Sequence, residues 1–254
     1  MKNTHSNTLK DFFSFIKKPT FDSFEDLSLG KKILVLIKIY FLTIVLLIIT
    51  DRIIRVLIEL GIFGKYAQII HTPDSSDKEL TRLYLFVLFL IIPVLEEFSF
   101  RLLLIKYNKK FIIYSTSLII GFYIYQFSSS YLFFPANKIL LCFTPYLYII
   151  LFSAIIIKII LFISNKVTII NPEAVWNNKF HLIFYLVAIL FSLHHISGLN
   201  INSSHYLFLP IILLPFFIYA VILGYIRIRL GLFYSIMLHL LLILPKIVNS
   251  ISNL

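Results

Sequence analysis

Residues 83–105 read LYLFVLFLIIPVLEEFSFRLLLI and combine two features that rarely occur together. The stretch matches the roughly 20 apolar residues that an α-helix needs to cross the hydrocarbon core of a bilayer. It also places Glu96, Glu97 and Arg101 inside this apolar run, where an ionisable side chain is costly and is rarely kept without a role. We therefore expect a membrane-spanning helix with functional side chains.

The composition of the whole chain is that of a membrane protein. Of its 254 residues, 59% are hydrophobic and only 14% are charged, and the mean hydropathy is +0.94. A soluble domain carries about 25% charged residues, so too few polar side chains remain here to cover a water-soluble globule. We predict an all-α fold, a polytopic bundle of transmembrane helices with lipid against its apolar surface.

Seven segments are long and apolar enough to be spanning helices. They are Ile33–Thr50, Leu83–Ile105, Phe111–Phe127, Ile139–Ser164, Phe180–Ile196, Tyr206–Ile226 and Gly231–Val248. Pro210 and Pro215 are expected to kink the sixth of them, which neighbouring groups can accommodate in lipid.

The spans divide the chain into three parts. Residues 1–32 form a cytoplasmic N-terminal tail, too polar for a signal peptide, in which Phe12, Phe13, Phe15 and Ile16 suggest an amphipathic surface helix. Residues 33–82 form the first transmembrane helix and an interfacial segment, whose start at residues 52–57 is expected to lie as a helix along the outer interface. Residues 83–250 form the main transmembrane domain.

Clusters of basic residues predict the orientation of the chain. The net charge is +11, but Lys and Arg fall in short groups between apolar runs, a pattern that indicates anionic lipid headgroups as partners and excludes nucleic acid. With seven alternating spans, Lys109, Arg227 and Arg229 fall on the same side as the N-terminal tail. The stretch around Asn200 then lies outside, and the positive-inside rule places the N-terminus in the cytoplasm.

Five ionisable residues in three of the spans are candidates for one site. Glu97 and Arg101 are four residues apart and can pair on one helix face, whereas Glu96 points about 100° away and stays available. His195 ends the fifth span and His239 lies in the middle of the seventh. Gathering these groups in one cluster costs less than burying each of them alone.

Such a cluster has the parts for general-base hydrolysis, in which a buried carboxylate takes a proton from water and imidazoles stabilise an oxyanion. Glu96, His195 and His239 are also candidate ligands for a divalent metal such as zinc, although the His-Glu-x-x-His pattern of zinc enzymes is absent. A structural ion pair, and histidines that serve only as interhelical hydrogen-bond partners, remain open alternatives. His194 lies on a different face from His195 and is expected to be interfacial.

In order along the chain, the Glu-Glu-x-x-x-Arg motif at residues 96–101, the Phe-x-x-x-His motif at Phe191 and His195, and the later His239 resemble the CAAX protease and bacteriocin-processing (Abi) family of intramembrane peptidases. The resemblance covers roughly residues 83–245 and marks 83–250 as a CAAX-protease-like domain. It implies an endopeptidase of the bacterial inner membrane that cleaves a peptide or a lipidated protein.

The resemblance also implies a role for each residue. Glu96 would be the general base that activates water, and Glu97 and Arg101 would support it. His195 and His239 would polarise the scissile carbonyl or bind a metal, and Phe191 would pack against the substrate.

Two departures from the family pattern are visible. Ile243 stands four residues after His239, where the family usually has Asn or Asp, and the interval from Arg101 to Phe191 holds two additional spans. An isoleucine cannot donate a hydrogen bond to an oxyanion. Ile243 therefore favours, as the second hypothesis, a catalytically impaired member that acts as a bacteriocin-immunity or scaffold protein. A proton-coupled transporter ranks third, because no repeat symmetry is present.

Overall fold

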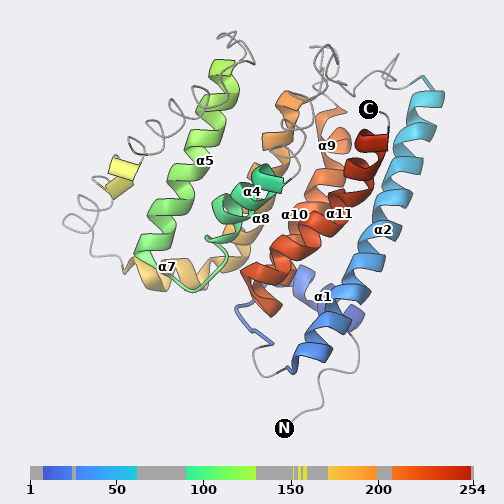
Figure 1. Ribbon diagram of the computed structural model, residues 1–254. Helices are drawn as coiled ribbons and strands as arrows, with labels where there is room; N and C mark the ends of the chain where they lie inside the picture. The colour runs from blue at the N-terminus through green and yellow to red at the C-terminus, as the bar shows by residue number, and fades with distance from the viewer. Residues whose placement is uncertain are drawn as a thin grey trace.

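The computed structural model describes residues 8–24, 27–61, 90–129, 171–198 and 208–252, together with residues 151, 154–155 and 157–158. Every element in these ranges is helical (Figure 1), which confirms the all-α prediction. The expected span Ile139–Ser164 and the residues around Asn200 lie almost entirely outside the described ranges.

Five long helices run along the same general direction (Figure 1). They are α2 (Leu29–Glu59), α5 (Lys109–Ser129), α8 (Phe180–His194), α10 (Leu214–Leu230) and α11 (Leu232–Ser252). Helix α10 packs against α2, α8 and α11, and the short α4 (Ile92–Arg101) packs against α5, α8 and α11. Helices α1 (Thr8–Lys17) and α7 (Pro172–Asn178) lie at the end of the bundle nearest the N-terminus.

Helix α2 is longer than the span expected from the sequence. It continues without a break from Leu29 to Glu59, a run of 31 residues, so the separate interfacial helix expected at 52–57 is wrong. The reason is local: no proline or glycine stands between Thr50 and Glu59, and Asp51 pairs with Arg55 one turn on, at 2.7 Å. At 1.5 Å per residue the helix is about 46 Å long, longer than the roughly 30 Å hydrocarbon core of a bilayer.

The helix that carries the two glutamates is short. The turn at residues 90–91 has π-helical geometry, α4 follows with Pro93 in its first turn, and α4 ends at Arg101. Residues 102–106 form turns and bends, so the helical end expected at Ile105 is wrong. The Nε atom of Arg227 donates to the terminal carbonyl of Arg101 at 3.1 Å, which satisfies a backbone acceptor that a helix end leaves open.

The predicted disturbance at Pro210 and Pro215 is confirmed as a break. Helix α9 (Leu209–Ile212) stops before Leu213, and α10 begins with Pro215 in its first turn, where a missing N–H costs no helical hydrogen bond. Helix α10 ends at Leu230 and is followed by Gly231, whose φ of +105° favours glycine and whose N–H bonds back to the carbonyl oxygens of Ile226 and Arg227.

Helix α1 packs onto the bundle through its aromatic side chains. Phe12 and Phe15 are 1% and 2% exposed and make edge-to-face contacts with Tyr225 of α10, and Phe13 is 52% exposed on the outer face. The helix is amphipathic as predicted, but Phe12 and Phe15 face the protein. The protein interior, which already holds Tyr225, buries this aromatic surface more completely than a membrane interface would.

Few of the described helices are long and apolar enough to cross a membrane. Within the described ranges, α2 is the one helix that is long and apolar enough by itself, and α7 with α8, bent by 76° between them, passes as a pair. The apolar run Leu232–Pro245 of α11 is shorter. The seven-span arrangement therefore stays a prediction.

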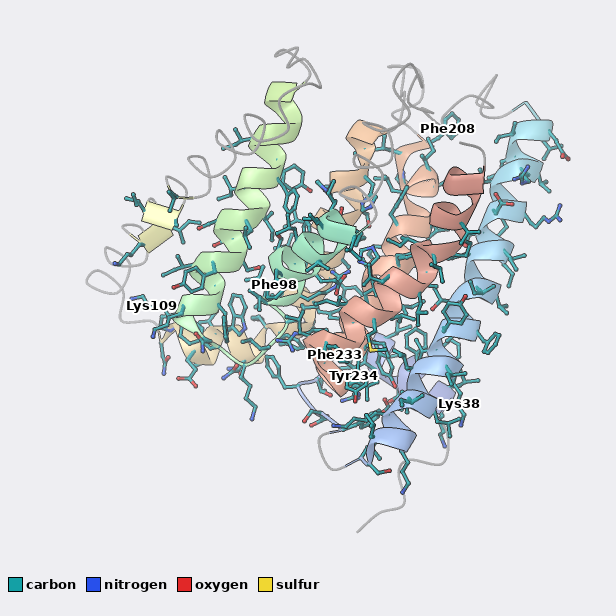
Figure 2. The ribbon with its side chains drawn as sticks, viewed as in Figure 1. Lys38, Phe98, Lys109, Phe208, Phe233 and Tyr234 are labelled. Atoms are coloured by element: carbon teal, nitrogen blue, oxygen red, sulfur yellow. The ribbon has the colours of Figure 1, made fainter. Side chains whose placement is uncertain are left out.

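Figure 2 shows the exposed Lys38 on the outer side of α2 and Lys109 at the end of the bundle where α7 lies.

Candidate functional site

Helix α4 brings two carboxylates and a guanidinium into the interior of the bundle. Glu96 is 6% exposed, and Glu97 and Arg101 are fully buried. The Nε atom of Arg101 lies 3.5 Å from Oε2 of Glu97, which confirms the predicted pair one turn apart. The Arg101 guanidinium also lies over the ring of Phe191, 4.6 Å from its centroid. None of its nitrogens has a hydrogen-bond partner among the described residues.

His239 of α11 lies between the two carboxylates. Its Nδ1 is 3.1 Å from Oε1 of Glu97, and its Nε2 is 3.8 Å from Oε2 of Glu96. A carboxylate can only accept, so the imidazole donates its Nδ1 proton to Glu97 and turns Nε2 toward Glu96. The separation of 3.8 Å is longer than a direct hydrogen bond. The predicted approach of Glu96, Glu97 and His239 is confirmed as geometry.

Ser235 is a further residue of the cluster. It lies one turn before His239 on α11, is fully buried, and donates its hydroxyl proton to Oε2 of Glu97. Glu97 is therefore contacted by three groups: Arg101, Ser235 and His239. These contacts fix the carboxylate of Glu97, which in turn orients the imidazole of His239. The i, i+4 spacing of Ser235 and His239 was a sequence signal for this contact.

His194, the last residue of α8, lies against Glu96. Its Nε2 is 3.4 Å from Oε1 of Glu96, and its side chain is 13% exposed. The interfacial position expected for His194 is therefore wrong. The buried face of α8 passes through Phe184, Val187 and Phe191 at spacings of three and four residues, and three residues further it reaches His194. Continuing that spacing was the sequence signal that could have placed it.

His195 lies near the cluster in a different way. Its Nδ1 is 2.9 Å from the carbonyl oxygen of Phe191 and must donate to it. Its ring stacks on Phe216 at 4.4 Å between centroids and lies 4.8 Å from the ring of Phe191. The chain tightens into a 3-10 turn at His195–Gly198, which turns this side chain toward α10.

The predicted substrate contact Phe191 is 1% exposed and packs on Phe100 and under the Arg101 guanidinium. Phe191 is therefore buried inside the cluster, where it packs against other side chains of the protein. For the metal, no three His, Cys, Asp or Glu side chains of the described residues form a group that could hold an ion. The divalent-metal ligands remain a prediction.

The arrangement is suited to moving protons. Glu96 has one oxygen near an imidazole of α8 and the other near an imidazole of α11, and Glu97 fixes the tautomer of His239. A carboxylate beside an imidazole, both shielded from bulk water, is the combination used in general acid–base catalysis. The same groups could also carry a proton relay.

Comparisons with known proteins identify no similar protein. No family model matches the chain, and neither the curated proteins nor the solved structures include a significant match.

Proposed function

We propose that this chain is an intramembrane endopeptidase of the CAAX-protease/Abi type, which hydrolyses a peptide bond of a peptide or lipidated protein by general-base catalysis. The observation that carries the proposal is the placement of His239 between two buried glutamates, at 3.1 Å from Glu97 and 3.8 Å from Glu96. The glutamates belong to α4 and His239 belongs to α11, and more than 130 residues of sequence separate these helices. No local preference of the chain therefore explains why His239 lies next to the glutamates.

In the proposed reaction Glu96 accepts a proton from water, and the resulting hydroxide adds to the scissile carbonyl carbon. The imidazoles of His239 and His195, in their doubly protonated form, donate Nε2–H to the carbonyl oxygen and stabilise the negative charge that develops on it. When the C–N bond breaks, Glu96 returns its proton to the leaving amine nitrogen. Glu97 accepts the Nδ1 proton of His239, so the role of His239 needs the doubly protonated imidazolium, whose Nε2–H can donate to the carbonyl oxygen. The positive charge of Arg101 balances the negative charge of Glu97.

The reaction is proposed to take place in a bundle of seven spans in the bacterial inner membrane. The outer face of α2 supports this location, because large apolar residues recur along it at spacings of three or four residues. Those residues are Ile33, Ile37, Phe41, Val45 and Ile48, each more than 40% exposed. A continuous apolar stripe of this length on a soluble protein would be an aggregation hazard, whereas in a bilayer it faces lipid.

The distribution of basic residues supports a cytoplasmic N-terminus. The first turns of α2 and α5, and the last turn of α10, lie at the same end of the bundle (Figure 1). These turns carry Lys31 and Lys32, Lys109 and Lys110, and Arg227 and Arg229. Helix α1, with Lys17 in its last turn, lies at that end as well. Such an end is the one retained in the cytoplasm.

Cysteine-accessibility labelling tests the location. In a Cys142→Ser background, which removes the single native cysteine, Lys109→Cys should react with an impermeant maleimide only after the membrane is opened. Asn200→Cys should react in intact cells. Labelling of position 200 from the cytoplasm alone would overturn the span count and the orientation.

Substitution of the base tests the chemistry. Glu96→Gln keeps the size and hydrogen bonding of the side chain but cannot take a proton from water, so peptide cleavage by the purified protein should fall by about 10²- to 10⁴-fold. Glu173→Gln, an exposed carboxylate of α7, is the matched control and should cleave like the parent. If Glu96→Gln cleaves at the parental rate, Glu96 is not the base.

One observation favours the second candidate, an immunity or scaffold protein built on the same fold. Ile243 lies one turn beyond His239 on α11 and offers no donor to an oxyanion. Ile243→Asn should leave cleavage unchanged or raise it. If the parent cleaves no peptide, lipidated or not, and Ile243→Asn does, the chain is better described as a binding protein on a protease fold.

A further inference from the structure

We propose that His194, which lies outside the recognised motifs, is the positioning residue for Glu96. The inference rests on the proposed function, because it concerns the carboxylate that would act as the base. It assigns one imidazole to each carboxylate oxygen: His194 to Oε1 and His239 to Oε2.

The carboxylate of Glu96 has an imidazole next to each of its two oxygens. Nε2 of His194 lies 3.4 Å from Oε1 of Glu96, and Nε2 of His239 lies 3.8 Å from Oε2. The three residues belong to α8, α4 and α11, so the carboxylate connects three helices at one point. With Oε1 engaged, the carboxylate plane cannot rotate freely, and Oε2 keeps a fixed direction toward His239 and toward a water molecule that it would deprotonate.

The imidazole of His194 is itself fixed by aromatic contacts. Its ring makes edge-to-face contacts with Phe122 and Tyr123 of α5, at centroid distances of 5.0 and 6.2 Å, and lies 6.0 Å from Phe100 of α4. The hydroxyl of Tyr123 also donates to the carbonyl oxygen of Leu190 at 2.5 Å, which ties α5 to α8 one turn before His194. A side chain that is enclosed in this way can orient its neighbour, because it has few rotamers of its own.

His195 is engaged elsewhere. Its Nδ1 is bound to the carbonyl of Phe191 and its ring to Phe216, and within the described part of the chain it makes no ion-pair contact with Glu96 like those of His194 and His239. The two adjacent histidines therefore differ in role. His195 faces α10 and is left for the substrate carbonyl, whereas His194 faces α4 and acts through Glu96.

The test uses two substitutions at 194 and a matched one at 195. His194→Leu removes the contact, His194→Gln keeps an amide N–H that can reach Oε1, and His195→Leu removes the neighbouring ring. The readout that needs no substrate is the reaction of Glu96 with dicyclohexylcarbodiimide in the purified full chain, measured by peptide mass spectrometry. This reagent adds the carboxyl O–H across its N=C=N group and rearranges to a stable N-acylurea, so it modifies the protonated acid in apolar surroundings.

His194→Leu should increase the modification of Glu96 severalfold, because the carboxylate loses a donor that favours its ionised form. His194→Gln should return it toward the parental level, and His195→Leu, which removes no hydrogen bond to Glu96, should raise it less than His194→Leu does. In a cleavage assay, His194→Leu should lower kcat by about 10- to 100-fold with little change in KM, as expected when a catalytic group is misaligned. His194→Gln should recover most of kcat.

The two proposals fail in different ways. Equal modification of Glu96 in the parent and in both variants at 194 would overturn the role of His194, even if the parent cleaves peptides. A response of the modification to His194 in a protein that cleaves nothing would support the positioning role and overturn the peptidase. If His194→Leu does not fold, Phe122→Leu, which removes an aromatic contact of the His194 ring, takes its place. A modification level of Glu96 in Phe122→Leu equal to that of the parent would then overturn the inference.

Discussion

Two buried arginines at the ends of α4 and α10 are bound in opposite ways. Arg229 is 5% exposed, and its guanidinium contacts both carboxylate oxygens of Asp11, at 3.1 and 3.3 Å, and donates to the carbonyl oxygen of Asp22. Arg101 is fully buried, lies 3.5 Å from Glu97, and has no hydrogen-bond partner among the described residues. The first arginine is satisfied and the second is not.

The difference indicates what each arginine does. The bidentate contact of Arg229 is the strong geometry for a guanidinium and a carboxylate, and the backbone carbonyl of Arg229 also accepts from the N–H of Phe24 at 2.7 Å. Arg229 thus fastens the N-terminal segment to the end of α10. Arg101 has an ion pair with Glu97 and a cation–π contact with Phe191, but its guanidinium makes no hydrogen bond to the described residues, and burying unbonded N–H groups costs stability. Groups that break a local rule in this way are expected at functional sites.

The arrangement around Arg101 depends on Glu97. Its two oxygens serve Arg101, Ser235 and His239 together, whereas Asp11 serves Arg229 and the hydroxyl of Tyr225. Asp11 is 27% exposed, so water can replace a lost partner there; Glu97 is fully buried, and water cannot. The same kind of substitution should therefore have a larger effect at Glu97.

The largest effect is expected for Glu97→Gln. The substitution leaves the Arg101 guanidinium buried without a negative charge, which typically costs about 3–5 kcal/mol of unfolding free energy. Denaturant titration of the purified protein in detergent measures it. The double variant Glu97→Gln with Arg101→Met should recover much of the loss, because no unpaired charge remains. A Glu97→Gln protein as stable as the parent would show that the pair is not a unit.

A smaller and more local effect is expected for Arg229→Met. The substitution removes the charged contacts to Asp11, worth about 1–3 kcal/mol, while Phe12 and Phe15 keep their apolar contacts. The N-terminal segment should become sensitive to limited proteolysis before the rest of the chain, and the unfolding free energy should fall by less than for Glu97→Gln. Lys38→Gln, at an exposed position of α2, is the control. Uniform proteolysis along the chain would contradict a local fastening role.

The sequence predicted the parts of the site that depend on one helix. The pairing of Glu97 with Arg101 follows from their spacing of four residues, and the burial of both follows from the apolar residues around them. The histidine His239 was predicted because an ionisable group in a strongly apolar helix needs partners. The sequence indicated that His239 lies in one cluster with both glutamates, but it did not indicate the distances between them.

The sequence did not predict what depends on how helices end and face one another. The motif directed attention to His195, but the 3-10 turn that begins there leaves His194 facing Glu96. Asp11 was assigned to a polar tail, and the structure pairs it with Arg229 across more than 200 residues of sequence. The spacing of the buried residues of α8 could have placed His194 on the inner face of that helix but not against Glu96, and the contact of Asp11 with Arg229 leaves no periodic signal in the sequence.

The division has a simple physical origin. Composition, apolar runs and i, i+4 spacings act within one helix, so the sequence alone determined that the chain is helical, which residues must be paired, and that Pro210 and Pro215 disturb the sixth span. Which imidazole meets which carboxylate depends on the rotation and ends of three helices, because a change of one residue in register turns a side chain by about 100°. Only the tertiary structure decided that Glu96 lies between His194 and His239.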